Sequence, residues 1–199
     1  MSVGSIKEKI SFEKRVAITP ETAKNIISLG LNINLEKDYA THLGISDKQY
    51  EEVGVKFYNS ALEVINNSKL LLKVNCPTDI EIKSLKEETI LVGIFNPTKN
   101  ENKFKEILKK NINIFSLELL PRISRAQSMD VLSSQSNLAG YRAVIESIYE
   151  FEKAVPMMMT AAGTVPAARV LVIGAGVAGL QAIATAKRLG AIVSATDVR

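Results

Sequence analysis

The chain has 199 residues, of which 46% are hydrophobic and 23% charged, a composition typical of a folded globular protein with one large domain or two smaller ones. Its net charge is +4, but the 25 Lys and Arg residues are scattered among 21 Asp and Glu residues, so no charged block indicates nucleic-acid binding. A single cysteine, Cys76, and a single histidine, His42, exclude an intrachain disulfide and any metal site built from several cysteines or histidines.

Patterns typical of strands and helices alternate over the first 116 residues. Residues 3–18 predict a strand that leads into a loop, and Thr19 and Pro20 predict the start of a helix that ends at Gly30. Further strands are predicted at 31–35, 55–57, 70–74, 89–95 and 112–116, and helical segments at 39–43, 46–53, 61–65, 78–85 and 100–110. This alternation favours a doubly wound, mostly parallel sheet.

Residues 117–137 are polar on all sides and contain Arg122, Gln127 and Asp130. An apolar stripe resumes at Leu138, so we expect a loop and then a long helix from about Gln127 to Phe151. At a spacing of three, Gln127, Asp130 and Ser133 would drift slowly around one side of its first turns. Such a segment at a domain junction is favoured as a binding cleft. The other interpretation is a solvated helix start.

A strand, a glycine turn, a helix and a second strand follow in close succession near the C-terminal end. The apolar run 170–173 precedes Gly174, Gly176 and Gly179, which form the pattern G-x-G-x-x-G. Helical spacing then runs from Val177 to 189, and a second apolar run covers 191–195. Asp197 comes just after that run. This is the context in which the glycine pattern indicates a dinucleotide-binding site.

Each glycine of this pattern, and the aspartate that follows it, has a physical reason to occupy its position. Gly174 permits a tight turn, Gly176 lets the pyrophosphate approach the backbone, and Gly179 lets helix and strand pack closely. Asp197, 18 residues after Gly179, can accept hydrogen bonds from the adenosine ribose and should repel a 2′-phosphate, which favours NAD(H) over NADP(H). Arg199 leaves that preference open, because a nearby arginine can accommodate the phosphate. A glycine turn that binds nothing is the alternative.

The predicted fold class is therefore α/β, with two doubly wound parallel-sheet domains of Rossmann or flavodoxin type. We expect the first domain at 1–135 and the start of an NAD-binding Rossmann domain at 136–199. A dinucleotide-binding domain normally continues with more βα units, so the second domain is expected to be truncated after its first βαβ unit. The chain is therefore expected to be a fragment or a truncated gene product. The three methionines at 157–159, in the segment before it, are expected to fill a core or an interface.

The segments RAQSMDVLSSQSNLAGYRAVIE and MMMTAAGTVPAARVLVIGAGVAGLQAIATAKRLGAIVSATDVR closely resemble the α subunit of proton-translocating NAD(P) transhydrogenases. EKRVAITPE, LLKVNCPTD and LVGIFNPT resemble the same family, so the similarity covers essentially the whole chain. The resemblance implies two doubly wound α/β domains related to alanine dehydrogenase. It also implies hydride transfer from NADH to NADP⁺, coupled to proton translocation across a membrane.

The resemblance also implies a set of site residues. Arg122 and Asp130 would orient the carboxamide of the nicotinamide, Gln127 would lie beside the ring, and Ser133 belongs to the same polar segment. The full set of residues expected to bind NAD(H) is Arg122, Ile123, Ser124, Gln127, Ser128, Met129, Asp130, Gly174, Gly176, Val177, Gly179, Asp197, Val198 and Arg199. No metal is expected.

The partners implied by the resemblance are a transhydrogenase β subunit that binds NADP(H), a membrane domain and a second copy of the NAD(H)-binding domain. The chain itself would be cytoplasmic and peripheral on the inner face of the plasma membrane.

The nearest rival is an NAD-dependent enzyme similar to alanine dehydrogenase. Arg15 matches the carboxylate-binding arginine of that family, and Lys73 matches its catalytic lysine. The expected catalytic histidine is absent, because this chain has LVGIFNPT at that place, and His42 lies elsewhere. We therefore interpret Arg15 and Lys73 as framework or cleft residues. A non-catalytic NAD-binding partner is a third hypothesis.

Overall fold

The computed structural model describes residues 1–198, so Arg199, which the sequence places at the adenosine ribose, lies outside the described residues. The chain folds into two compact units, Met1–Pro121 and Arg122–Arg199. The domain boundary expected between residues 135 and 136 falls inside a long helix of the second unit and stays an expectation.

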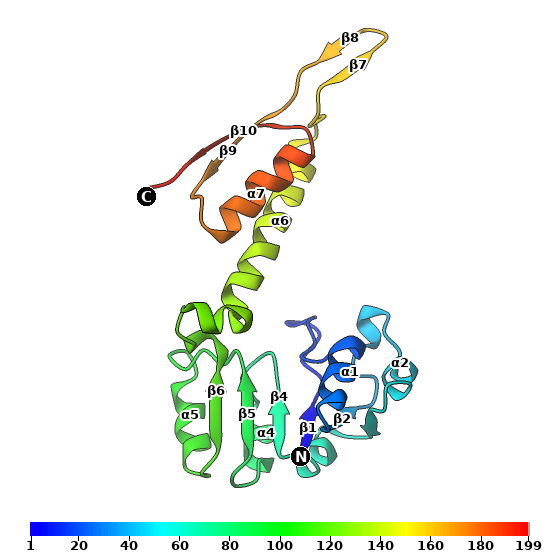
Figure 1. Cartoon of the computed structure of the whole chain (residues 1–199), viewed down its shortest axis with the longest axis vertical. Helices are drawn as coiled ribbons and strands as arrows, with labels where there is room; N and C mark the ends of the chain where they lie inside the picture. Colours follow the sequence, from blue (N-terminus) through cyan, green and yellow to red (C-terminus); the bar gives the residue numbers. More distant parts are fainter. Residues whose placement is uncertain (199) are drawn as a thin grey trace. The chain divides into compact units, whose positions relative to one another are not determined.

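The first unit contains a six-stranded parallel sheet in the order β3-β2-β1-β4-β5-β6 within the described residues (Figure 1). Its strands are β1 (Ser2–Ser5), β2 (Asn32–Glu36), β3 (Lys56–Tyr58), β4 (Leu70–Leu72), β5 (Ile90–Gly93) and β6 (Asn113–Ser116). Its α-helices are α1 (Pro20–Ser28), α2 (Asp47–Glu51), α3 (Ala61–Asn66), α4 (Asp79–Ser84) and α5 (Glu101–Leu108), and a 3₁₀ turn, η1, covers Thr41–Leu43. The order and the parallel pairing confirm the predicted doubly wound sheet.

Local signals in the sequence set the ends of these elements. Thr19 accepts a hydrogen bond from the backbone N–H of Thr22 and caps α1, and Gly30 has a φ of 80°, where a side chain would be strained. Thr78 caps α4 in the same way through the N–H of Glu81. These caps confirm the starts predicted for both helices.

The core of the first unit forms two clusters. One gathers α3, α4 and α5 residues such as Val64, Ile82 and Ile107, and the other packs around Tyr39 and Tyr50. The Tyr39 hydroxyl accepts hydrogen bonds from the N–H groups of Ala17 and Ile18 at 3.0 and 3.3 Å and contacts the Ser5 hydroxyl at 2.7 Å. It therefore attaches the loop after β1 to the core.

The second unit contains α6 (Val131–Phe151), an antiparallel hairpin of β7 (Met158–Thr160) and β8 (Gly163–Val165), and the βαβ segment β9 (Arg169–Ile173), α7 (Val177–Arg188) and β10 (Ile192–Thr196). Strands β9 and β10 are parallel, as the glycine pattern predicted. The helix predicted from about Gln127 begins instead at Val131, after a 3₁₀ segment, η3 (Ser124–Met129). The prediction was wrong there because the Asp130 side chain caps the helix through the N–H of Ser133.

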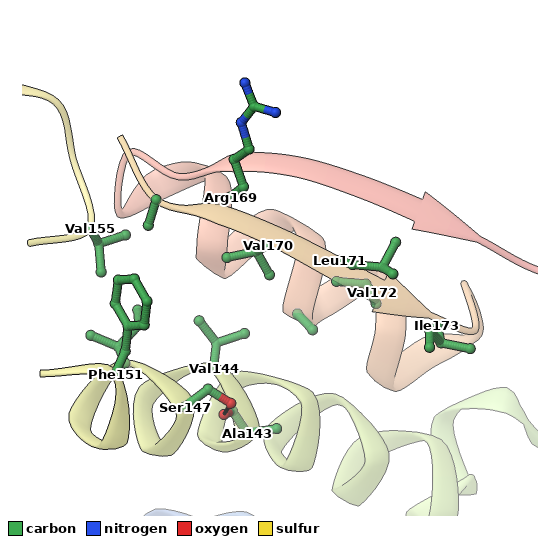
Figure 2. Close-up of a pocket in the computed structure, with 13 residues that line it drawn as sticks. Ala143, Val144, Ser147, Phe151, Val155, Arg169, Val170, Leu171, Val172 and Ile173 are labelled. Atoms are coloured by element: carbon green, nitrogen blue, oxygen red, sulfur yellow. Dashed lines mark hydrogen bonds between the residues drawn. The ribbon is translucent and has the colours of Figure 1, made fainter. Parts of the chain in front are cut away.

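Alternate residues of β9 face different surroundings. Val170 and Val172 are half-buried, whereas Leu171 and Ile173 are exposed. A groove of about 440 Å³ lies between β9 and α6, lined mostly by apolar side chains such as Val144 and Phe151 (Figure 2). Apolar walls of this kind favour packing against another polypeptide segment over binding of a charged ligand.

Met157, Met158 and Met159 are exposed at the β7–β8 hairpin. The core alternative is therefore wrong in this unit, whereas their place in an interface stays a prediction. In the part of the chain that the structure describes, no helix is both long and apolar enough to cross a bilayer.

Replacing Tyr39 by Phe should destabilise the first unit by about 1–3 kcal/mol, because the buried N–H of Ile18 and the partly buried N–H of Ala17 lose their acceptor. Urea unfolding monitored by circular dichroism measures the change. Tyr149→Phe removes a hydroxyl from an exposed ring and should leave the free energy of unfolding unchanged. Equal free energies of unfolding for the wild type and Tyr39→Phe would contradict this role of the Tyr39 hydroxyl.

Candidate functional site

The glycine turn between β9 and α7 is held against the end of β10. Gly174 has a φ of 96°, and its N–H donates to the carbonyl of Thr196 at 2.7 Å. A Cβ at Gly179 would overlap the carbonyl oxygen of Gly174 and lie 2.8 Å from its carbon. Both glycines are therefore required by backbone geometry, whereas Gly176 has open space beside it.

Helix α7 presents an uncapped N-terminus beside this turn. Gly176 is the N-cap residue and provides no side chain, and the first turn contains no acidic residue. The unpaired N–H groups and the positive end of the helix dipole attract an anion to such a place. The open space at Gly176 leaves room for a phosphate to approach.

Asp197 follows β10 and contacts the turn directly. Its Oδ2 accepts a hydrogen bond from the N–H of Ala175 at 2.6 Å, and its side chain is half-buried. The acid predicted for the ribose is therefore fixed in position relative to the turn. Val198 beside it is exposed.

The polar segment before α6 is organised by Asp130. Oδ1 of Asp130 accepts from the N–H of Ser133 at 2.9 Å, and Oδ2 accepts from the Ser133 hydroxyl at 2.6 Å. These hydrogen bonds, with the charge of Arg122 nearby, lower the pKa of Asp130 below its usual value. Asp130 is therefore the N-cap of α6 and an ionised group at its start.

Two cavities bring the predicted residues together, and Arg122 lines both. The smaller, of about 240 Å³, is lined by Arg122, Ile123, Ser124, Ala126, Gln127 and Asp130. The larger, of about 640 Å³, joins Arg122 and Ser133 to the glycine turn at Gly174, Gly176, Val177 and Gly179. Ser128 and Met129 lie in η3 and line neither cavity. The arrangement can accept a long ligand with a phosphate at one end of the cavity and a polar group at the other.

Eight residues of the larger cavity were not predicted from the sequence as site residues. Four of them lie on one side of α6 and are Ser136, Ala139, Gly140 and Ala143, and the others are Val172, Ile173, Ala178 and Ala182. The signal of the α6 residues in the sequence is a stripe of small residues at helical spacing, which alone does not distinguish close helix packing from a ligand site.

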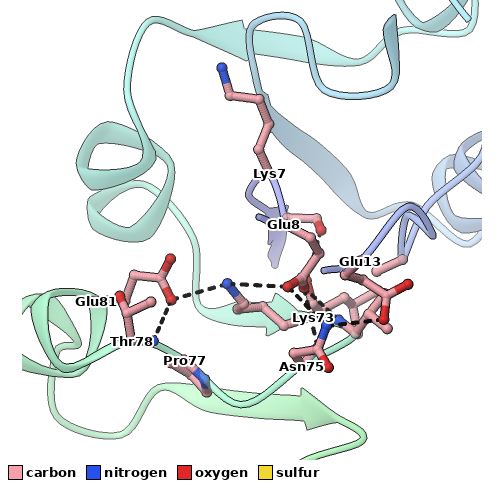
Figure 3. Close-up of polar contacts among 12 residues, drawn as sticks. Lys7, Glu8, Glu13, Lys73, Asn75, Pro77, Thr78 and Glu81 are labelled. Atoms are coloured by element: carbon pink, nitrogen blue, oxygen red, sulfur yellow. Dashed lines mark hydrogen bonds and ion pairs between the residues drawn. The ribbon is translucent and has the colours of Figure 1, made fainter. Parts of the chain in front are cut away.

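A second polar cluster lies in the first unit, where β1 and β4 end (Figure 3). The buried Nζ of Lys73 lies 3.0 Å from Glu81 and 4.0 Å from Glu8. Nε and Nη2 of Arg15 donate to the two carboxylate oxygens of Glu13 at 2.8 and 2.7 Å. The Asn75 amide links Glu8 to Glu13. Both cations that could hold a substrate carboxylate are thus paired with carboxylates of the chain itself.

His42 is half-buried, and its Nε2 lies 2.8 Å from the carbonyl oxygen of Lys14. It lies in η1 and lines neither the cavity beside Lys73 nor the cavities of the second unit.

Comparison with known proteins gives matches over both units. Residues 4–139 match the family model of the alanine dehydrogenase/PNT N-terminal domain, and residues 143–199 match that of the C-terminal domain. The chain is 48% identical to an NAD(P) transhydrogenase subunit alpha protein of Rickettsia prowazekii, over 100% of the chain and 53% of that protein. It therefore spans about half the length of this relative.

Solved structures agree with these matches. The crystal structure of the transhydrogenase from Sinorhizobium meliloti is 47% identical, with a TM-score of 0.94 over 100% of this chain and 59% of the other. An L-alanine dehydrogenase structure has a TM-score of 0.84 at 22% identity, over 100% of this chain and 55% of the other, which shows a shared fold.

The Glu13–Arg15 pair predicts a pH-dependent contribution to stability. Hydrogen bonds from Arg15 lower the pKa of Glu13 from 4.5 to about 2, so the pair stabilises the folded chain above about pH 4.5 and loses this effect as the pH falls toward 2. Glu13→Gln should therefore cost about 1 kcal/mol near neutral pH, since Arg15 is partly exposed, and progressively less in acid.

Urea unfolding of both proteins across this pH range measures the difference. Glu88→Gln, at an exposed ion pair with Lys69, is the matched control and should change little at any pH. A cost of Glu13→Gln that is constant with pH would refute the pairing.

Proposed function

Because the chain belongs to the alanine dehydrogenase/PNT family, we propose that it is the NAD(H)-binding region of a transhydrogenase. NADH held in the second unit passes a hydride to NADP⁺ held by a partner subunit, and this transfer is coupled to proton translocation across a membrane. The observation that carries the proposal is the larger cavity, in which Arg122 and Ser133 face the same space as the glycine turn.

The adenosine half of NAD(H) is assigned to the turn and the end of β10. The N-terminus of α7 and the open space at Gly176 accommodate the pyrophosphate, and Asp197 accepts the ribose hydroxyls. We also assign Val198 and Arg199 to the surroundings of this ribose. The fixed carboxylate of Asp197 disfavours a 2′-phosphate and so favours NAD(H).

The nicotinamide half is assigned to the polar segment. Arg122 donates to the carboxamide, Gln127 lies beside the ring, and Asp130 with Ser133 fixes the segment at the start of α6. Ile123 and Ser124 line the smaller cavity, and Ser128 and Met129 belong to η3 beside it.

When bound, the nicotinamide supplies the hydride from its C4 atom. The reaction needs no proton transfer by the protein, so the role of Arg122, Gln127, Asp130 and Ser133 is to position the ring for a second nucleotide. That is consistent with a chain whose only histidine, His42, lines none of the site's cavities.

Because this relative is named as a subunit, the proposed function includes partner chains. We assign a β subunit that binds NADP(H), a membrane domain and a second copy of this NAD(H)-binding region. The chain would then be held at the cytoplasmic face of the plasma membrane through its complex.

An alanine-dehydrogenase-like activity is the second candidate, favoured by the shared fold and by Arg15 and Lys73. The internal pairing of both cations with Glu8, Glu13 and Glu81 disfavours it, because a 2-oxo acid would have to displace a carboxylate already held. Oxidation of NADH in the presence of pyruvate and ammonia would favour this candidate over the transhydrogenase.

Asp197→Asn should weaken NADH binding about tenfold or more, because hydrogen bonds from ribose to a charged acceptor are lost. It should also reduce discrimination against NADPH, since the repelling charge is gone. Fluorescence titration of the full chain with each nucleotide measures both effects. Asp79→Asn, in the first unit, is the control and should bind as the wild type does. Failure of the wild-type chain and of its assembled complex to bind NADH would disprove the proposed function.

A further inference from the structure

Helices α6 and α7 approach each other at Gly140. This residue is buried in the middle of α6, and a Cβ added there would overlap the carbonyl oxygen of Ala178 and lie 2.8 Å from its carbonyl carbon. The obstruction is backbone, which cannot rotate away as the end of a side chain could. The two helices therefore pack backbone against backbone at this place.

The position of this contact in α7 is informative. Ala178 lies in the first helical turn, between Val177 and Gly179, where the N–H groups assigned to the pyrophosphate are located. Gly179 in turn packs on the carbonyl of Gly174. A displacement at Ala178 would thus move the glycine turn together with the start of α7.

The position of Gly140 in α6 is equally informative. It lies seven residues after Ser133, about 10 Å along the helix, and Ser133 is held by Asp130 at the helix N-cap. Helix α6 therefore joins the polar segment rigidly to the contact with α7. Glycine within a helix costs about 1 kcal/mol relative to alanine, so its presence here needs a packing reason, and the contact provides one.

We propose that Gly140 is a positioning residue of the NAD(H) site, which sets the separation between the polar segment at the start of α6 and the pyrophosphate turn at the start of α7. The inference rests on the proposed function and extends it. Gly140 need not touch the nucleotide; it fixes how far apart the two places lie that hold the nicotinamide and the phosphates.

The test compares NADH with ADP-ribose, which lacks the nicotinamide, by calorimetric titration of the full chain. ADP-ribose contacts the turn and Asp197, which move together with α7, whereas NADH must also reach the polar segment. Gly140→Ala should weaken NADH binding about tenfold or more and ADP-ribose binding about threefold or less. A purely structural role would weaken both ligands by the same factor.

Ser147→Thr is the matched control, because it adds one methyl group to the same helix at an exposed position outside the larger cavity. It should leave both affinities unchanged. If circular dichroism shows that Gly140→Ala does not fold, Ala143→Val takes its place. Ala143 lies one turn further along α6, lines the same cavity as Ala182 of α7, and should give the same contrast between ligands.

Equal losses for the two ligands, or no loss for either, would overturn the role of Gly140 while leaving the proposed function intact. A wild-type chain that binds ADP-ribose and NADH with equal affinity would also overturn it, since no nicotinamide contact would then exist to be positioned. Failure to bind either ligand, both by the wild-type chain and by its assembled complex, would overturn both proposals.

Discussion

The second unit depends on two places where backbone meets backbone without an intervening side chain. Gly179 lies against the carbonyl of Gly174, and Gly140 lies against the carbonyl of Ala178. The first contact closes the turn between β9 and α7, and the second joins that turn to α6. Since neither contact includes a rotatable group, the main chain sets the spacing of α6, α7 and the turn beside the cavity, which suits a ligand that must be held at two separate points.

Features that depend on near neighbours were predictable from the sequence. The glycine turn, α7 and the position of Asp197 after β10 follow from a strand, a helix and their spacing within about 30 residues. In the first unit, Thr19 and Gly30 mark the two ends of α1, and alternating patterns were enough for a parallel sheet. Candidate site residues are thus most predictable where their motif is continuous along the chain.

Features that depend on distant contacts were not predictable in this way. In the sequence, Asp130 is compatible both with the first turn of a helix and with the N-cap position. Only its hydrogen bonds to Ser133 decide between the two. The packing role of Gly140 depends on Ala178, which is 38 residues away in the sequence. Met157 to Met159 are a further case, because hydrophobic composition alone does not distinguish a position in a core from one in an interface.

The ion cluster around Lys73 has a consequence for how sequences of this kind can diverge. Lys73 is almost fully buried between Glu8 and Glu81, so the loss of the lysine alone would leave two carboxylates without their counter-charge in a poorly solvated place. Exchanging the whole set for apolar or neutral groups would carry a much smaller penalty. Substitutions at these three positions are therefore expected to occur together in homologous chains and rarely one at a time, which makes this cluster a source of covariation unrelated to nucleotide binding.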